Sequence, residues 1–310
     1  MSTRIAPTST VLAALAELVR APAALTVPGD TLAGSAAAYR PMRGRRLALP
    51  AASVALYWAG MALNDYADRE LDAVERPERP IPSGRIRPGQ ALAVAGGLTA
   101  AGLSLAAVGG GRDALLVAVP LAGAVWAYDL VLKPTPAGPL AMAACRGLDV
   151  LLGAGASGAR RALPAAAVLA GYTASVTLLA RGEVAGASRD AGAAAAGTTA
   201  AAAVAAAGLA ARNGAPLASA APNRPPSRLR DHVLTAVAAA GLVASTGRAQ
   251  LAAARDPSAP TVRRATIAGI HGMVPLQVAL AARPGFRLGA LGVLAALPAA
   301  RLLARMVSPT

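Results

Sequence analysis

Four side chains whose oxygen atoms suit a hard cation lie close together after an apolar segment: Asn64, Asp65, Asp68 and Asp72. Residues four apart advance about 40° around a helix axis, so Asn64, Asp68 and Asp72 form one polar stripe on a predicted helix, with Asp65 beside it. Mg²⁺ prefers carboxylate oxygens together with phosphate and water, so this stripe could hold the metal of a magnesium-diphosphate ligand. The alternative is an ordinary solvated helix end with charges four residues apart. Such groups at the end of a membrane helix are costly, which favours a functional site.

A loop rich in proline and arginine follows over residues 73–88, and its composition excludes a long helix there. Its arginines lie close in sequence to the carboxylates: Arg76, Arg79, Arg85 and Arg87. A diphosphate site needs both carboxylates and arginines, because carboxylates hold a metal that bridges some diphosphate oxygens while guanidinium groups bind others in pairs. For any single arginine, the alternative is a positive loop that faces lipid head groups.

The composition indicates a membrane protein. Of 310 residues, 55% are hydrophobic and 15% are charged. The 30 basic residues exceed the 15 acidic ones, and loops that face anionic lipid explain this excess better than a nucleic-acid partner does. Lys133 alone interrupts the arginines, a bias typical of bacteria with GC-rich genomes. The single Cys145 excludes an intramolecular disulfide and a cysteine-rich zinc site.

Apolar segments recur along the chain and predict an all-α integral membrane bundle of about nine transmembrane helices. We expect a single polytopic membrane domain over residues 1–310. In the first segment, an interfacial start near Arg20 should precede a spanning helix of about 20 residues. Residues 233–254 are only marginally apolar, so they either span or lie on the surface. The predicted spans are 10–38, 47–63 (continued to 72), 89–108, 114–132, 139–158, 161 or 162–180, 191–211, 261–282 and 288–307.

The polar stripe resembles the NxxxDxxxD motif of the UbiA superfamily of intramembrane prenyltransferases, with Asn64, Asp68 and Asp72 in the three positions. Residues 79–86 (RPIPSGRI) are similar to the RP-x-x-SG-x-I signature that follows it there. Residues 20–22 and the pairs at 128–129 and 133–134 add further similarity. Segments 145–149, with Gly153, and 181–184 most resemble the EboC-like subgroup of this superfamily.

The resemblance implies a Mg²⁺-dependent transfer of an isoprenyl group from an allylic diphosphate to an aromatic or alcohol acceptor within the membrane. Asp68 and Asp72, with Asn64 and Asp65, would hold the metal. The resemblance implies that the diphosphate is bound by Arg79, Lys133 and Tyr128. Without the resemblance, Lys133 would be a cation at the negative end of a helix dipole, and Arg20 an interfacial arginine with its head group in water rather than a phosphate contact.

Two charged residues lie three apart inside the predicted span 139–158. Arg146 and Asp149 either pair with each other or line a polar cavity, where Arg146 would contact substrate.

The loop after the sixth predicted span departs from the family. A second DxxxD motif is usual there, but this chain offers Glu183 and Asp190, with Ala187 where a second carboxylate would stand. We expect Glu183 to complete the metal site. The departure leaves two alternatives: a noncatalytic membrane protein that binds or moves a lipid-linked or aromatic metabolite, and a lipid-alcohol transferase of different chemistry.

The chain should lie in the cell membrane as a multi-pass protein. Basic residues of the predicted loops divide almost equally between the two sides, so the positive-inside rule does not fix the orientation. The resemblance implies that the aspartate-bearing loops face the cytoplasm.

Overall fold

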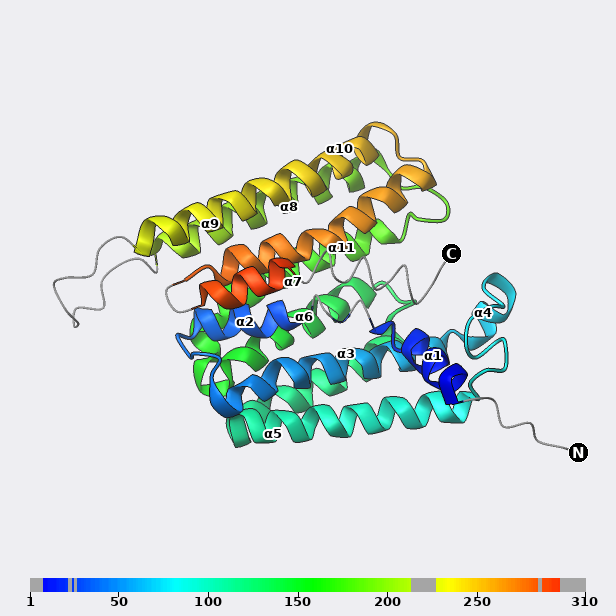
Figure 1. The fold of residues 1–310 in the computed structure, drawn as a ribbon. Helices are drawn as coiled ribbons and strands as arrows, with labels where there is room; N and C mark the ends of the chain where they lie inside the picture. Colours follow the sequence, from blue (N-terminus) through cyan, green and yellow to red (C-terminus); the bar gives the residue numbers. More distant parts are fainter. Residues whose placement is uncertain (1–7, 22–23, 25–26, 213–226, 284–285, 296–310) are drawn as a thin grey trace, which may run out of the picture.

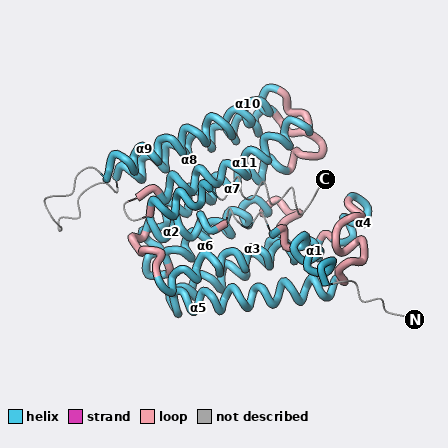
Figure 2. The backbone as a smooth tube through the Cα atoms, viewed as in Figure 1, coloured by secondary structure: helices cyan, strands magenta, loops and turns pink. Residues whose placement is uncertain are grey.

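The computed structural model describes residues 8–21, 24, 27–212, 227–283 and 286–295, and in these residues it contains helices and loops without a strand (Figure 2). The predicted all-α bundle is therefore confirmed. The helices are α1 (Thr8–Leu18), α2 (Pro28–Ala37), α3 (Ala48–Ala67), α4 (Arg69–Glu75), α5 (Pro88–Ala127), α6 (Gly138–Ala154), α7 (Ala159–Ala180), α8 (Arg189–Arg212), α9 (Ser227–Leu242), α10 (Arg248–Arg255) and α11 (Ala259–Ala281). Two π-helical turns, η3 (Tyr128–Leu132) and η5 (Val243–Gly247), follow α5 and α9.

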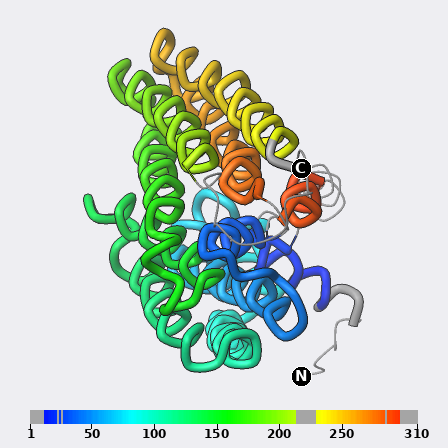
Figure 3. Tube along the Cα trace, turned by 90° about the vertical axis from the view of Figure 1, so that its left-hand side faces the viewer, coloured from blue at the N-terminus to red at the C-terminus, as the bar shows by residue number. Residues whose placement is uncertain are grey.

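Long helices run side by side in tiers (Figures 1 and 3), with α3 and α5 on one side, α8 to α10 on the other, and α2, α6, α7 and α11 between them. Four described stretches are long and apolar enough to cross a bilayer: Gly44–Ala67, Pro88–Leu132, Ala156–Ala180 and Arg189–Arg212. The chain is thus a multi-pass membrane protein, and the other helices pack alongside these four.

Helix α5 is two antiparallel arms joined at Gly111. Gly111 has φ 61° and ψ −148°, a conformation that glycine adopts at little steric cost. The arms lie side by side, because Trp126 Nε1 donates to Thr99 Oγ1 at 3.0 Å. The predicted spans 89–108 and 114–132 are therefore both present, and the turn between them is confirmed.

The first apolar segment differs from the prediction. Helix α2 has 10 residues, half of the roughly 20 that a bilayer requires, so the expected spanning helix within 10–38 is wrong. Pro28 lies in the first turn of α2 and begins the helix, and Arg20 has a φ of 47° that no helix continues through. Pro22, quoted above with Arg20, lies outside the described residues.

Helices α2 and α6 touch through their backbones. A Cβ atom on Gly34 would lie 1.7 Å from the Val150 carbonyl oxygen, and one on Gly153 would lie 1.8 Å from the Thr31 carbonyl oxygen. Small residues allow this approach, which membrane helices commonly use to associate. The crossing fixes α2 against the helix that carries Arg146 and Asp149.

The loop over 73–88 is confirmed, since α4 ends at Glu75 and turns lead to the start of α5 at Pro88. In the C-terminal part, α9, η5 and α10 continue one another along α8 and α11 (Figure 1). Most of the predicted span 288–307 lies outside the described residues. So does most of the polar loop that the sequence predicts over 213–230, and its last four residues begin α9 instead.

Candidate active site at the end of an apolar cavity

The predicted polar stripe crosses a helix junction. Helix α3 ends at Ala67, and Asp68, with φ −85° and ψ 2°, joins it to α4. Backbone hydrogen bonds from Asp68 to the Asn64 carbonyl (2.9 Å) and from Asp72 to the Asp68 carbonyl (2.8 Å) keep the four-residue spacing. The side chains of the stripe nevertheless have separate partners, so in this structure their oxygen atoms do not converge on one position for a metal ion.

Arg79 joins two buried carboxylates. Its Nη1 atom lies 2.7 Å from Asp72 Oδ2 and 3.3 Å from Asp65 Oδ1. Arg20 Nη2 also contacts Asp65 Oδ1, at 3.1 Å. Asp65 and Asp72 are almost fully buried, with exposures of 4% and 1%, so their charges need these guanidinium partners. The structure therefore brings Arg79 to the predicted metal ligands, as expected from its place in the sequence.

The turn η3 supplies the other partners of the stripe. Lys133, directly after η3, forms an ion pair with Asp68. Asn64 Nδ2 donates to Asp129 Oδ1 at 3.4 Å, a long hydrogen bond. Lys133 is thus more than a cation at a helix end, since its ion pair with Asp68 links η3 to the junction between α3 and α4.

The donors suit Mg²⁺, although their cations hold them apart. No three acidic, histidine or cysteine side chains gather as a metal site in the described part of the chain. Asp72 Oδ1 is buried without a hydrogen bond, and its ion-pair partner Arg76 Nη1 is 3.6 Å away. Carboxylate and amide oxygens are what Mg²⁺ takes from proteins. The residues therefore fit this ion by donor type and by one open oxygen.

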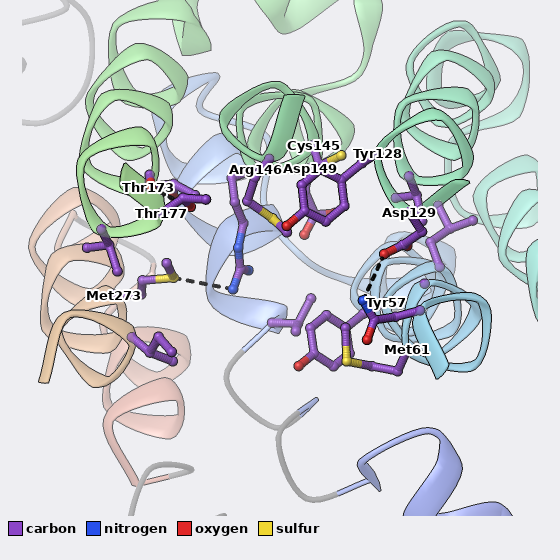
Figure 4. Close-up of a pocket in the computed structure, with 18 of the residues that line it drawn as sticks. Tyr57, Met61, Tyr128, Asp129, Cys145, Arg146, Asp149, Thr173, Thr177 and Met273 are labelled. Atoms are coloured by element: carbon purple, nitrogen blue, oxygen red, sulfur yellow. Dashed lines mark hydrogen bonds between the residues drawn. The ribbon is translucent and has the colours of Figure 1, made fainter. Parts of the chain in front are cut away.

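A cavity of about 350 Å³ reaches Asn64 of the stripe and Arg20, the partner of Asp65, and Figure 4 shows part of its lining. Helix α3 lines it with Ser53, Tyr57, Gly60 and Asn64 on successive turns, so it follows about 16 Å of that helix. We call the Asn64 side the motif end and the Ser53 side the deep end. The wall between them is mainly apolar. The cavity is also lined by Arg20, Tyr128, Asp129, Arg146, Asp149, Thr173 and Met273.

Two charged groups of α6 line the deep end. Arg146 Nη1 donates to Asp30 Oδ2 at 2.5 Å, and Asp149 Oδ2 accepts from Ser53 Oγ at 2.6 Å. No hydrogen bond or ion pair links Arg146 to Asp149 in the described part of the chain, so the cavity-lining alternative describes them better than mutual pairing.

Asp30 was missed by the sequence analysis. It is fully buried, and Gln277 Nε2 also donates to it, at 2.6 Å. A carboxylate inside the apolar stretch 27–38 was the available signal, because buried acids in membrane helices usually have a specific partner.

The loop with Glu183 is held by other contacts. Arg181 donates to the Thr135 carbonyl, next to Lys133, and Arg263 Nη2 donates to the Glu183 carbonyl at 3.3 Å. No hydrogen bond or ion pair joins the Glu183 carboxylate to the first motif among the described residues. The structure therefore does not bring Glu183 together with the other predicted ligands.

Comparison with known families identifies the family of this chain. The model of the UbiA prenyltransferase family matches residues 30–207. This range includes the stripe, the Arg79 loop, η3 and the cavity-lining residues of α6 and α7. Among curated proteins, digeranylgeranylglyceryl phosphate synthase of Methanospirillum hungatei JF-1 is 42% identical over 85 residues, which are 25% of this chain and 28% of that protein. The matched part of this chain thus spans little more than a quarter of that relative's length.

Solved structures share the fold. A structure reported for digeranylgeranylglyceryl phosphate synthase in membranes superposes with a TM-score of 0.61 at 16% identity, covering 90% of this chain and 99% of the other. A UbiA homologue of Archaeoglobus fulgidus, bound to GPP and Mg²⁺, gives a TM-score of 0.57 at 11% identity, covering 82% and 99%. At these identities the similarity establishes the bundle architecture.

Proposed function

The chain belongs to the UbiA prenyltransferase family, and from this premise we propose that it is a Mg²⁺-dependent enzyme that transfers an isoprenyl group from an allylic diphosphate to an acceptor within the membrane. One observation carries the proposal: the carboxylates of Asp65, Asp68 and Asp72 meet the cations of Arg79 and Lys133. This cluster adjoins an apolar cavity whose lining includes Asn64 and Arg20, the partner of Asp65. Both charges that a magnesium diphosphate needs are therefore assembled next to a space for a hydrocarbon chain. We extend the proposal to one membrane domain over residues 1–310.

The cations bind the diphosphate by exchanging partners. Arg79 and Lys133 each hold a carboxylate in the structure, and a diphosphate offers them oxygens of the same charge. As they turn to the diphosphate, the released carboxylates of Asp68 and Asp72, together with Asn64 and Asp65, become available as metal ligands. Mg²⁺ bound there would supply positive charge that bridges protein and diphosphate and stabilises the departing diphosphate.

The reaction begins at the carbon–oxygen bond between the allylic C1 atom and the diphosphate. This bond breaks and its electron pair leaves with the diphosphate, whose growing charge Arg79 and Lys133 neutralise. The apolar wall keeps water from the allylic cation until the acceptor attacks C1, forms the new bond and gives up a proton to the released diphosphate. Tyr128 lines the cavity next to Asp129 and faces the reacting end of the chain in this arrangement.

In the proposal, Glu183 adds a carboxylate to the metal site from the loop after α7. Its backbone carbonyl is bound by Arg263, while its carboxylate is available to turn toward a ligand. If it does not, the separate pairing of the first-motif carboxylates favours the second candidate, a noncatalytic membrane protein that binds or moves a lipid-linked or aromatic metabolite.

We propose an aromatic ring or an alcohol as the acceptor. The curated relatives are named for digeranylgeranylglyceryl phosphate, which makes an alcohol the acceptor class closest to them. The finer EboC-like assignment rests on residues 145–149 and 181–184. We place the chain in the cell membrane with the Arg79 and Glu183 loops on the cytoplasmic side.

Binding of geranyl diphosphate to the purified full chain in lipid nanodiscs, with Mg²⁺ or with EDTA, tests the proposal. We expect Mg²⁺-dependent binding, followed by slow release of diphosphate. A chain that binds no allylic diphosphate under either condition would have the second candidate function. Binding that depends on Mg²⁺ but never leads to diphosphate release, even after 4-hydroxybenzyl alcohol is added as an acceptor, would also contradict catalysis.

A further inference from the structure

Asp149 presents an unpaired oxygen to the deep end of the cavity. The residue is 6% exposed, and Ser53 Oγ occupies only its Oδ2 atom. Asp149 Oδ1 is buried and accepts no hydrogen bond from a donor group in the described part of the chain, while the carboxyl group of Asp30 lies within hydrogen-bond reach of the Asp149 carboxyl. A buried acceptor without a partner is costly, and native structures rarely keep one without a ligand, a water or a function to explain it. A ligand that fills the deep end should therefore offer a hydrogen-bond donor here.

Arg146 offers donors at the same place. Its Nη1 atom binds Asp30, whereas its Nη2 atom faces the Met273 sulfur at 3.3 Å. Figure 4 shows Arg146 reaching across the cavity toward Met273, with Asp149 on the same helix. A thioether is a weak acceptor, so an oxygen that entered the cavity would compete with it successfully. The deep end therefore presents one open acceptor and one weakly used donor.

The charge balance of the deep end selects the ligand. The carboxylates of Asp30 and Asp149 accompany one guanidinium, that of Arg146, while Ser53 and Gln277 are neutral. A carboxylate or phosphate on the ligand would add negative charge beside two carboxyl groups that already repel each other in a desolvated site. An ammonium group could donate to Asp149, but it would repel Arg146 and could accept nothing from it. A hydroxyl group both donates and accepts, and it adds no charge.

We propose that the deep end is a recognition site for a hydroxyl group of a neutral acceptor substrate, whose O–H donates to Asp149 Oδ1 and whose oxygen accepts from Arg146. The recognised hydroxyl is not the reacting group, because Ser53, at the deep end, and Asn64, at the motif end, are about 16 Å apart along α3. The acceptor thus carries its nucleophile toward the diphosphate and a second, uncharged polar group toward Asp149. This inference rests on the proposed function for what the acceptor does, but it concerns acceptor binding alone.

Three ring compounds that differ in one substituent test the site: 4-hydroxybenzyl alcohol, 4-hydroxybenzoate and 4-hydroxybenzylamine. Their binding to the full chain in nanodiscs is measured by ligand-observed NMR and equilibrium dialysis, without diphosphate. We expect the alcohol to bind at least about tenfold more tightly than either charged compound. Equal or tighter binding of 4-hydroxybenzoate by the unaltered protein would overturn the proposal, and this comparison needs no variant.

Variants then locate the preference. Asp149→Asn removes one negative charge at nearly constant shape, so the preference for the alcohol over the benzoate should fall at least about tenfold. Ser53→Ala removes the partner of Asp149 Oδ2 and keeps the charge, so the preference should persist. Asp231→Asn is the matched control, because Asp231 pairs with Arg287 away from the cavity. An unchanged preference in Asp149→Asn would place the site elsewhere.

Mg²⁺-dependent binding of geranyl diphosphate is measured on the same samples. It should be the same in Asp149→Asn as in the unaltered protein, since Asp149 does not touch the motif end. Loss of the alcohol preference with intact diphosphate binding supports this inference. Failure of diphosphate binding in the unaltered protein would instead count against the proposed function, so the two failures are distinguishable.

Discussion

Lys133 and Asp68 form an ion pair across 65 residues of sequence. The pair joins the turn η3 to the junction of α3 and α4, so a residue predicted to bind diphosphate is bound to a residue predicted to bind metal. The two predicted roles are compatible only if the pair opens when the ligand arrives. Each partner can therefore be tested for an effect on the ligand of the other.

Replacing Asp68 by Asn should lower the Mg²⁺-dependent affinity for geranyl diphosphate by about tenfold or more, because a carboxylate ligand is lost at nearly constant shape. Lys133→Gln should weaken diphosphate binding similarly, because the neutral amide no longer neutralises a phosphate oxygen. Isothermal titration at several Mg²⁺ concentrations separates the two, since only Asp68→Asn should raise the Mg²⁺ concentration needed. Arg69→Gln is the control, because Arg69 pairs with the exposed Glu70. If both motif variants bind geranyl diphosphate and Mg²⁺ like the unaltered chain, the stripe is an ordinary solvated helix end.

Arg79 should be sensitive to shape as well as charge. Arg79→Met would leave the buried carboxylates of Asp65 and Asp72 with one fewer cation, a loss that typically costs about 3–5 kcal/mol. Arg79→Lys keeps the charge but loses the planar fork, so it should unfold at an intermediate temperature and bind geranyl diphosphate less tightly than the unaltered chain. Thermal unfolding in nanodiscs measures the first effect and titration the second. Arg87→Met in the same loop should leave both unchanged, and an equal loss there would mean that the loop acts only through its overall charge.

The crossing of α2 and α6 should tolerate no side chain. Gly153→Ala would bring a Cβ atom to 1.8 Å from the Thr31 carbonyl oxygen, so the helices must separate, at a cost of about 1–3 kcal/mol. Asp30 on α2 would then move away from Arg146 on α6, and binding of 4-hydroxybenzyl alcohol should weaken with stability. Gly171→Ala in α7 is the matched control, because nothing lies within 4 Å of its Cβ position and alanine favours a helix. A Gly153→Ala protein as stable as the control would contradict this close packing.

The parts of the fold and site that follow from local sequence were predictable, and the parts that depend on distant partners were not. The four-residue spacing of Asn64 and Asp68, and the glycine turn at Gly111, are local features, and the structure keeps both. Asp30 accepts a hydrogen bond from Gln277, 247 residues away, and no local sequence pattern predicts such a pair.

The short helix α2 escaped prediction for a related reason. Its apolar composition is typical of a spanning helix, while its length is set by Pro28 at one end and by the turn at Tyr39, with φ 56°, at the other. The ion pairs of the first motif were equally invisible, because spacing places carboxylates on a face without saying which cation each one meets.

Glu183 decides whether a second carboxylate motif contributes to the proposed metal site, and it gives the last prediction. If its carboxylate turns toward the ligand, as we propose, Glu183→Gln should reduce Mg²⁺-dependent binding of geranyl diphosphate about as much as Asp72→Asn does, by roughly tenfold. Glu183→Asp should retain part of the affinity, because it keeps a carboxylate on a shorter side chain. Asp190→Asn is the control, since Asp190 lies in the first turn of α8 rather than in the loop.

Ala187→Asp extends this test, because it restores a carboxylate four residues after Glu183. Ala187 donates its backbone N–H to the Pro257 carbonyl at 2.9 Å, so the loop is anchored where the new side chain would start. Tighter Mg²⁺-dependent binding in Ala187→Asp would indicate that the loop is aligned with the first motif and lacks only a charge. If Glu183→Gln and Ala187→Asp both bind like the unaltered chain, the half-buried Glu183 carboxylate contributes as little as a surface ion pair, about 0–1 kcal/mol. The first motif would then act alone, and a binding or transport role would explain the chain better than catalysis.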